Sequence, residues 1–337
     1  MNDNYKYFSD YLACPYSKSN LKLVENNKSF SFESNANKYL IKNDIPVFFS
    51  KLNYNNPDDE KFMKSIEDFW DSGWEKRTEE DDHSFLYKLN EEELFKRIKS
   101  AYDSQKLRGE GIGNYFSNEI KIDFLKNKTC VIVGPGCGEE AMQLHLLSKA
   151  KVIGIDISHK SASLTNKFLH KFGDKSGIGI QGDSRFLPIQ SNSVDFVFSS
   201  GVIHHSPNIE KSINEIYRVL KPNGEFCVAL YHKHSVVWMK FLLKALLRGN
   251  WTKQKLNKYI SNQTEVAWIT DHKKNPHTRL FTKSECLELF KGFNNLHVRS
   301  GNFHTPGNLL LKFFSILENS KIMSNFGTMV FISGSKK

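Results

Sequence analysis

The chain contains 337 residues and has a net charge of +10, with 39% hydrophobic and 25% charged residues. This composition is typical of a soluble globular protein, and the length accommodates one α/β domain with appended segments. The positive charge would favour an acidic partner such as a nucleic acid, a phosphate or a membrane surface. A Lys- and Asn-rich solvated surface explains the same charge without a dedicated polyanion site, and we prefer this interpretation.

Cysteine usage and hydropathy exclude further classes of protein. The five cysteines are odd in number and show no close CxxC spacing, which argues against a disulfide framework and against a zinc knuckle. The N-terminal segment lacks a basic region followed by an apolar run, and no apolar stretch approaches the roughly 20 residues that span a bilayer. We therefore expect a cytoplasmic protein without a transmembrane segment.

Residues 1–50 are predicted to form a small β module. Residues 21–24 and 29–32 alternate like strands around a polar turn, and a further apolar run reaches residues 45–49. The segments LACPYSK (12–18) and NDIPVFF (43–49) resemble the Trm112-like family of small β domains. Zinc-binding members have a second cysteine where this chain has Ser17, so no zinc site is expected. In that family the module commonly docks on a methyltransferase or is fused to one, which implies a packing role.

Residues 51–116 are predicted to be a helical linker or lid. A polar connector over 51–60 leads into a helical pattern that is rich in aromatic residues, among them Trp70 and Trp74. Two interpretations of this segment remain open. It is either a lid that covers a ligand and shapes a substrate pocket, with Trp70 as a contact, or a helical layer whose aromatic residues belong to the core.

Residues 129–158 are predicted to form one βαβ unit. A β-branched run at 131–133 predicts a buried strand, and glycines follow at positions 134, 136 and 138. A helical pattern then begins at Glu139, and a second strand over 151–157 includes Asp156 near its end. Glycines let the backbone approach a ligand closely, and Asp156 is placed to accept hydrogen bonds from a ribose diol. The unit therefore predicts a site for a nucleoside-containing cofactor.

Strands and helices continue to alternate after this unit. The expected elements are a helix over 160–172, a strand over 177–181, a strand over 193–200, a helix over 208–220 that ends at the turn 221–224, and a strand over 225–231. A helix over 282–290 and strands over 294–298 and 328–332 follow. These patterns predict an α/β fold with a doubly wound, mostly parallel, seven-stranded sheet.

Two insertions interrupt the alternation. Residues 235–262 are apolar on one side and carry a basic stripe of Lys240, Lys244 and Arg248. This pattern fits a helix on a membrane surface, but we prefer a helix that packs over the substrate side of the domain. A second apolar helical insertion is expected near 305–320, centred on 309–317.

Five motifs in order resemble the class I S-adenosylmethionine-dependent methyltransferases, of the methyltransferase type 11 kind. They are GPGCG (134–138), Asp156, GDSRFLP (182–188), SVDFVFSSGVIHH (193–205) and EIYRVLKPNGEF (215–226). A nicotinamide or flavin fold would prefer G-x-G-x-x-G, whereas the third glycine here comes one position earlier. The resemblance covers roughly residues 115–232, and it implies a Rossmann-like methyltransferase domain over 117–337.

The resemblance implies S-adenosylmethionine as cofactor and a role for each matching residue. The glycine turn would pass under the methionine portion and ribose, Asp156 would take the ribose hydroxyls, and Ile157 would lie against adenine. Asp183 would accept a hydrogen bond from the adenine amino group. The full set of implied cofactor contacts is Gly134, Gly136, Gly138, Asp156, Ile157, Gly182, Asp183, Ser184, Ser200 and Gly201. The chain departs from the family at Ile132, where an Asp or Glu usually helps to hold the cofactor's ammonium.

Candidate catalytic residues follow the fourth and fifth predicted strands. An oxygen nucleophile would need a general base, and the candidates at this edge are His204, His205, Tyr231 and His232. The alternative is that one histidine of the pair is structural and bonded to a backbone carbonyl. His234 and Arg279 are candidate substrate contacts, although Arg279 would equally anchor its own loop. No metal site is predicted.

We therefore interpret the chain as a methyltransferase that transfers a methyl group to an oxygen, nitrogen or sulfur atom of a small or medium-sized metabolite by in-line displacement. One alternative is methylation of RNA, which the basic charge and the Trm112-like start favour. Against it, the chain has no Asn-Pro-Pro-Tyr-type motif and no recognised RNA-binding module. A further alternative is a regulatory protein that binds the cofactor without turnover, which Ile132 favours. The sequence makes no prediction of oligomeric state.

Overall fold

The structure is a computed structural model. It describes residues 2–26, 29–49, 57–80, 88–108, 122–172, 176–265, 274–301 and 323–337. The helical insertion expected near 305–320 lies outside the described residues.

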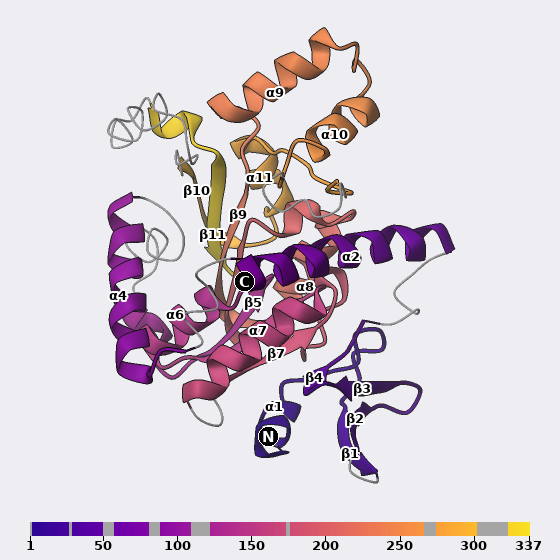
Figure 1. The fold of residues 1–337 in the computed structure, drawn as a ribbon, viewed down its shortest axis with the longest axis vertical. Helices are drawn as coiled ribbons and strands as arrows, with labels where there is room; N and C mark the ends of the chain where they lie inside the picture. The colour runs from indigo at the N-terminus through magenta and orange to yellow at the C-terminus, as the bar shows by residue number, and fades with distance from the viewer. Residues whose placement is uncertain are drawn as a thin grey trace.

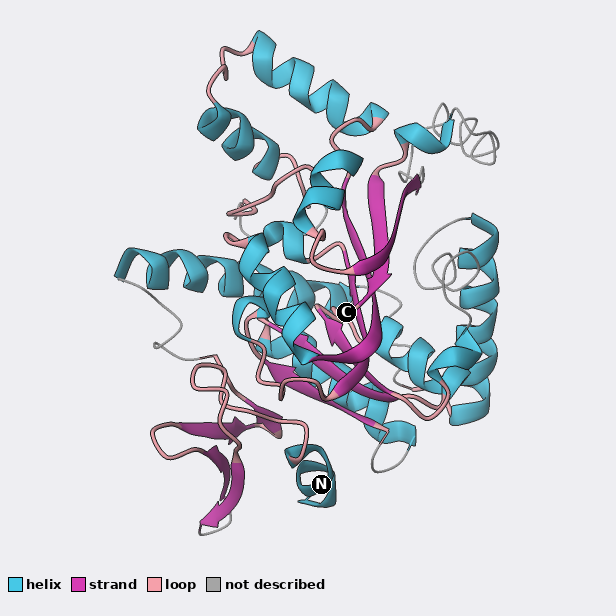
Figure 2. Cartoon of the chain, turned by 180° about the vertical axis from the view of Figure 1, so that it is seen from behind, coloured by secondary structure: helices cyan, strands magenta, loops and turns pink. Residues whose placement is uncertain are grey.

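A seven-stranded sheet forms the centre of the molecule (Figures 1 and 2). Its strands are β5 (Thr129–Val133), β6 (Lys151–Asp156), β7 (Gly177–Gln181), β8 (Val194–Ser200), β9 (Leu220–Tyr231), β10 (Asn294–Gly301) and β11 (Met329–Ser335). The spatial order is β10-β11-β9-β8-β5-β6-β7, and only β11 runs antiparallel to its neighbours. The predicted α/β fold with a mostly parallel seven-stranded sheet is therefore confirmed.

The strands alternate their side chains between two apolar layers, as a sheet covered on both faces requires. On one face Val131 and Val133 pack in a cluster with residues of α8 (Ile209–Val219). On the other face Ile132 packs with residues of α6 (Glu139–Ser148), while α7 (His159–Leu169) contacts β6 and β7. The helix α11 (Lys283–Leu289) contacts β10 and β11.

The turn expected at 221–224 is instead part of β9, which begins at Leu220. Asn223 has a left-handed φ of 60°, yet the backbone N–H of Asn223 donates to the carbonyl of Lys336 (3.2 Å). The register against β8 shifts between Val194 and Phe196. Tertiary pairing thus converts a turn-like sequence into a bulge inside a long strand.

The N-terminal module docks on the edge of the large sheet. It contains α1 (Asn2–Ser9) and an antiparallel sheet of β1 (Lys22–Asn26), β2 (Ser29–Glu33), β3 (Lys38–Lys42) and β4 (Ile45–Pro46). The N–H of Phe48 donates to the carbonyl of Gln181 on the edge strand β7 (2.8 Å). Phe8 and Phe48 are fully buried in the same cluster as Ile178 and Ile180. The module thereby covers a sheet edge and shares the main core.

The helix α2 (Pro57–Glu80) runs across the carboxyl ends of the strands, in front of α7 in Figure 1. Asp71 accepts hydrogen bonds from the hydroxyl of Ser158 (2.6 Å) and the N–H of Lys160 (2.9 Å) at the start of α7. Glu67 accepts one from the side-chain amide of Gln181 (2.9 Å). These bonds fix α2 over the sheet edge; α4 (Glu91–Arg108) packs farther away against α6.

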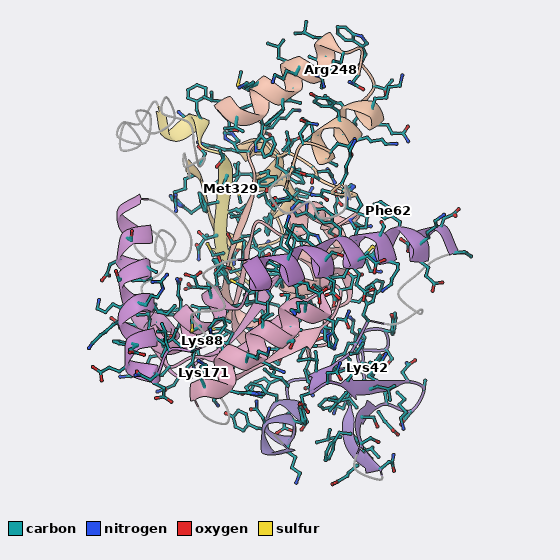
Figure 3. All side chains as sticks on the ribbon, in the orientation of Figure 1. Lys42, Phe62, Lys88, Lys171, Arg248 and Met329 are labelled. Carbon is teal, nitrogen blue, oxygen red and sulfur yellow. The ribbon has the colours of Figure 1, made fainter. Side chains whose placement is uncertain are left out.

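Residues 235–262 form two helices rather than one, α9 (Val236–Leu247) and α10 (Lys253–Ser261), which contact each other. Figure 3 shows α9 extending away from the sheet towards Arg248. Trp238 of α9 is buried with its ring centroid 4.9 Å from that of Tyr231, whereas Leu247 is 79% exposed. Among the described residues, no helix has the length and hydropathy needed to cross a membrane.

The shared core predicts that the N-terminal module stabilises the whole chain. Phe48→Ala removes a side chain that is 1% exposed, and we expect the free energy of unfolding to fall by about 3–5 kcal/mol. Denaturant unfolding, followed by tryptophan fluorescence, measures this loss. Leu40→Ala on β3 is the control, because Leu40 is 48% exposed and its loss should cost little. A Phe48→Ala protein as stable as Leu40→Ala would contradict a shared core.

The two hydrogen bonds of Asp71 predict that this residue attaches α2 to α7. Asp71→Ala leaves the N–H of Lys160 without its acceptor, and we expect a loss of about 1–3 kcal/mol together with faster amide exchange in α2. Hydrogen-exchange mass spectrometry of α2 peptides is the measurement. In the matched control Asp68→Ala, the lost group is a half-exposed partner of Lys64 (3.1 Å), and exchange should change little. Equal exchange in both variants would show that Asp71 does not hold the helix.

Candidate functional site

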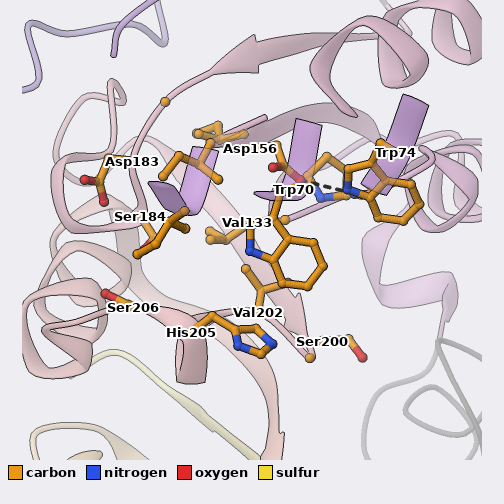
Figure 4. A pocket seen from close by; sticks show the side chains of 18 of the residues that line it. Trp70, Trp74, Val133, Asp156, Asp183, Ser184, Ser200, Val202, His205 and Ser206 are labelled. Carbon is orange, nitrogen blue, oxygen red and sulfur yellow. Dashed lines mark hydrogen bonds between the residues drawn. The ribbon is translucent and has the colours of Figure 1, made fainter. Parts of the chain in front are cut away.

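A cavity of about 630 Å³ opens at the carboxyl edge of the sheet. The chain crosses from β7 to β8 on the other side of β5 here, and ligands of open α/β sheets bind at such a switch point. Figure 4 shows the indole of Trp70 between Asp156 and His205, with Asp183 and Ser184 on one side and Trp74 and Ser200 on the other. The volume falls within the range of small-molecule and cofactor sites.

The structure brings most of the predicted site residues together around this cavity. The predicted residues that line it are Trp70, Gly134, Gly136, Asp156, Ile157, Gly182, Asp183, Ser184, Ser200, Gly201, His205 and Tyr231. Gly138, His204, His232, His234 and Arg279 do not line it. The roles of the lining residues as ligand contacts remain predictions. The surroundings of the five residues that do not line the cavity are described below.

The glycine turn connects β5 to α6 and needs its glycines for two different reasons. Gly136 has a φ of 58°, and a Cβ there would lie 2.5 Å from the ring of Trp74. Gly138, with a φ of 85°, is the N-cap of α6, and a Cβ there would lie 2.9 Å from the Cα of Thr165. Gly136 therefore allows close approach from the cavity, whereas Gly138 allows α6 to pack on α7.

Asp156 is tied to the glycine turn. Its carboxylate accepts hydrogen bonds from the N–H of Gly136 (3.4 Å), the N–H of Ser158 (2.9 Å) and the hydroxyl of Ser161 (2.7 Å). Burial raises the pKa of Asp156 to about 6, and these hydrogen bonds oppose the rise. The carboxylate is therefore ionised at neutral pH and can accept hydrogen bonds from a diol in the cavity.

Asp183 binds its own neighbour. The guanidinium of Arg185 donates to its Oδ2 (2.7 Å), and the N–H of Arg185 donates to its Oδ1 (2.8 Å). A carboxylate has further lone pairs, so Asp183 can still accept a hydrogen bond from a ligand. The hydroxyl of Ser184 lies 2.9 Å from that of Ser212 on α8, which fixes this corner of the cavity.

Ile132 is fully buried in the core and does not line the cavity. Two other acidic side chains do, Glu139 and Glu140 at the start of α6. Burial and the neighbouring Glu139 raise the pKa of Glu140 to about 8. Among the described residues, Glu140 has no ion-pair partner. The cavity thus contains carboxylates on the glycine turn although the family's usual acidic position is apolar.

A cluster of three polar side chains, His205, Tyr231 and Glu265, lies at the carboxyl ends of β8 and β9. The hydroxyl of Tyr231 donates a hydrogen bond to Oε1 of Glu265, and that oxygen lies 4.0 Å from Nε2 of His205. Trp70 covers the group with its ring centroid 5.1 Å from that of His205. Burial lowers the pKa of His205 to about 4, so the imidazole is neutral at pH 7, and burial raises the pKa of Tyr231 well above 10.

The other predicted catalytic histidines lie outside the cavity. His204 is fully buried with its ring centroid 4.0 Å from that of Tyr231, and burial holds its pKa well below 6.5. His232 is buried, and its Nδ1 lies 2.9 Å from the carbonyl of Gly327, so the ring donates to a backbone carbonyl. His234 is exposed. The described residues contain no group of three or more His, Cys, Asp and Glu placed to hold a metal ion.

Arg279 also lies away from the cavity. Its guanidinium is 3.5 Å from Glu210 on α8, and its Cζ is 5.0 Å from the ring centroid of Phe281. Its N–H donates to the carbonyl of His204 (3.0 Å). These contacts match the alternative in which Arg279 anchors its own segment.

Sequence reasoning missed several residues of the cavity. They are Met63, Ile66, Trp74, Val133, Pro135, Cys137, Glu139, Glu140, Ile155, Val202, Ser206, Pro207, Glu265 and Met329. Those beside the predicted motifs could have been found by extending the motifs by one or two positions. Glu265 and Met329 follow no motif, since they come from a loop after α10 and from an antiparallel strand. Only the folded chain places them at the site.

The described residues fit S-adenosylmethionine. A carboxylate anchored on a glycine turn suits a ribose, Asp183 suits an adenine amino group, and Ser200 and Gly201 border the space beyond the turn. The described residues that line the cavity include five carboxyl side chains, those of Glu139, Glu140, Asp156, Asp183 and Glu265, and no Lys or Arg. Such a lining suits a ligand with cationic sulfonium and ammonium groups.

Comparisons with known proteins agree with this geometry. A family model described as a methyltransferase domain matches residues 133–228. Phosphoethanolamine N-methyltransferase 2 of Caenorhabditis elegans is 32% identical over 111 residues, which are 33% of this chain and 25% of that protein. The ubiquinone/menaquinone biosynthesis C-methyltransferase UbiE of Rickettsia typhi is 29% identical over 150 residues, 42% of this chain and 60% of that protein.

The solved structures to which the chain is similar share less of its sequence. A methyltransferase of Thermotoga maritima, described as S-adenosylmethionine-dependent and as a possible histamine N-methyltransferase, is 21% identical, with a TM-score of 0.44 over 76% of this chain and 98% of that one. The chain spans about a quarter of the length of the first curated relatives it matches. The match to the family model runs from the end of β5 into β9, a stretch that includes the glycine turn and Asp156.

Proposed function

We propose that this chain is an S-adenosylmethionine-dependent methyltransferase that acts on a small or medium-sized metabolite. The observation that carries this proposal is the Asp156 carboxylate hydrogen-bonded to the glycine turn, at the switch point of the sheet and inside a cavity of about 630 Å³. The family match to residues 133–228 supports the same activity. Relatives named for phosphoethanolamine, sterols and quinones support a metabolite as acceptor.

The residues divide the cavity into a cofactor side and an acceptor side. Asp156, Asp183 and the glycine turn would hold S-adenosylmethionine, which supplies an electrophilic methyl group on a sulfonium. Trp70, His205 and Tyr231 would position the acceptor in line with that methyl and exclude water. The polar ties of α2 support its role as the lid of this site, with Trp70 and Trp74 facing the cavity.

Glu139 and Glu140 would hold the ammonium of the cofactor, because the apolar Ile132 replaces the acidic residue that usually does so. A cofactor's ammonium needs a carboxylate near the glycine turn, and these two line the cavity on that turn. Binding a cation there would also relieve the repulsion between two neighbouring carboxylates, of which Glu140 is half-buried. In this proposal the acidic group lies at the start of α6 and not at position 132.

Two finer assignments belong to this proposal. The antiparallel sheet β1–β4 docked on β7 supports a Trm112-like module that packs on the methyltransferase domain. Ile132 still favours a regulatory protein that binds the cofactor without turnover as the second candidate.

Equilibrium binding and turnover together test the proposed function. We expect the full chain to bind S-adenosylhomocysteine in isothermal titration calorimetry and to release it from S-adenosylmethionine in a small-molecule extract of the source organism. Binding without release would favour the regulatory candidate. Absence of binding would overturn both.

Asp156 predicts a pH-dependent affinity for S-adenosylhomocysteine. The ionised carboxylate accepts the ribose hydroxyls, so the affinity should fall about tenfold between pH 7 and pH 5, which is roughly one unit below its pKa of about 6. Asp156→Asn should weaken binding at least about tenfold at pH 8 and remove the dependence between pH 5 and 7. Asp68→Asn, at a half-exposed position on α2, is the control. A pH dependence that persists in Asp156→Asn would assign the titration to another group.

Substitution of Glu140 is expected to weaken the binding of S-adenosylhomocysteine but not that of adenosine. At pH 8.5 Glu140 is mostly ionised, because its pKa is about 8, and Glu140→Gln then removes the charge that would hold the ammonium. S-adenosylhomocysteine should bind at least about tenfold more weakly at this pH, because charged hydrogen bonds contribute about 1.5–3 kcal/mol. Adenosine lacks the ammonium and should bind as to the unmodified chain. Glu92→Gln on α4, with its side chain 77% exposed, controls for a change in net charge. Equal weakening of both ligands would place Glu140 elsewhere than at the methionine portion.

A further inference from the structure

The group formed by His205, Tyr231 and Glu265 leaves one buried nitrogen without a partner. Nε2 of His205 has no hydrogen-bond partner among the described residues, although His205 is only 5% exposed and lines the cavity. A buried polar atom without a partner costs free energy, so it needs a function or a ligand. The residue lines the cavity on the side proposed above for the acceptor.

The tautomer of His205 follows from the other ring nitrogen. Nδ1 lies 2.9 Å from the carbonyl oxygen of His277. The side-chain nitrogen of Asn275 is also 3.2 Å from Nδ1, but its two N–H groups have acceptors in the hydroxyls of Thr264 and Thr278 (3.0 Å each). A carbonyl oxygen only accepts hydrogen bonds, so we assign the proton to Nδ1 and a lone pair to Nε2. The hydroxyl of Thr278 also donates to the carbonyl of His277 (2.8 Å), which holds this acceptor in place. His205 therefore has an unprotonated Nε2 in a ring that lines the cavity.

Glu265 is placed to stabilise the protonated ring. Its Oε1 lies 4.0 Å from Nε2 of His205 and accepts a hydrogen bond from Tyr231. Its backbone has a φ of 57°, a left-handed conformation that costs free energy for a residue other than glycine. The strained backbone conformation therefore occurs at Glu265, the residue whose carboxylate lies near the imidazole of His205.

The rest of the lining limits the acceptor. The described cavity-lining residues contain no Lys or Arg, so a phosphate or carboxylate on the acceptor would meet carboxylates without a counter-ion. An amine needs no base at the moment of methyl transfer once it is neutral. A hydroxyl must lose its proton as it is methylated, and a base with an adjacent carboxylate suits that requirement.

We propose that the acceptor is an uncharged hydroxyl-bearing metabolite and that His205, paired with Glu265, removes the hydroxyl proton during methyl transfer. This inference rests on the proposed function. The hydroxyl oxygen forms a bond to the methyl carbon while the carbon–sulfur bond breaks, and that electron pair stays on sulfur. The hydroxyl proton passes to Nε2 of His205, so the products are a methyl ether, S-adenosylhomocysteine and an imidazolium next to the Glu265 carboxylate.

Product chemistry tests the proposal directly. The full chain is incubated with S-adenosylmethionine labelled with ¹³C on the methyl group and with a small-molecule extract of the source organism. We expect proton–carbon NMR to find the label as an O-methyl group in a product that neither cation nor anion exchangers retain at pH 7. A labelled N-methyl product on the cation exchanger, or a C-methyl product, would overturn the proposal and leave the proposed function standing.

Variants separate the two residues. His205→Gln should lower the initial rate of methyl transfer about 100-fold or more, with the affinity for S-adenosylhomocysteine within about threefold of the unmodified chain. Glu265→Gln should lower the rate about tenfold. His159→Gln at the start of α7 and the exposed Glu288→Gln are matched controls that should transfer methyl groups normally. A His205→Gln protein with an unchanged rate would contradict the role of the base.

A measurement without turnover checks the geometry. The titratable groups around His205 are His204, Tyr231, Glu265 and His277. Nitrogen NMR of the S-adenosylhomocysteine complex should show a neutral His205 with its proton on Nδ1 at pH 7. In Glu265→Gln the imidazolium should form only at lower pH than in the unmodified chain, because its counter-ion is gone. A proton on Nε2, or an unchanged titration, would overturn the pairing. A chain that does not bind S-adenosylhomocysteine would fail at the proposed function itself.

Discussion

The parallel register of β5, β6, β8 and β9 is the constraint on which the site depends. Parallel neighbours end at the same edge of a sheet, so the residues that follow each strand meet there although they are far apart in the chain. The glycine turn after β5, Asp156 at the end of β6, Ser200 at the end of β8 and Tyr231 at the end of β9 all reach one cavity in this way. The reversal of strand order beside β5 leaves room for a ligand between them.

Polar contacts from outside the sheet close this edge. Asp71 and Glu67 of α2 bond the first residues of α7 and the end of β7, which brings Trp70 and Trp74 over the glycine turn. The N-terminal module pairs with the end of the same β7 through Phe48. Both appended segments therefore attach to Gln181 at the carboxyl end of β7.

Burial gives the two sides of the cavity different electrostatics. It raises the pKa of Glu140 and Asp156 and lowers that of His205, because a desolvated group favours its neutral form. On the side proposed for the cofactor, binding of a cationic ligand would favour the ionised forms of Glu140 and Asp156. On the side proposed for the acceptor, the neutral imidazole of His205 lies 4.0 Å from one carboxylate, that of Glu265, which is an arrangement suited to general-base catalysis.

The sequence by itself determined the sheet, its mostly parallel strands and the residues on the side of the cavity that we propose for the cofactor. Those features depend on local patterns, such as β-branched runs, the glycines at 134, 136 and 138, and Asp156 at a strand end, and each pattern acts within a few residues. The tertiary structure decided the remainder. It turned residues 221–224 into a bulge, buried His204 and placed His205 at the cavity, and it brought Glu265 to Tyr231. Two adjacent histidines have the same propensities, and only packing and long-range hydrogen bonds decide that His205 lines the cavity and His204 does not.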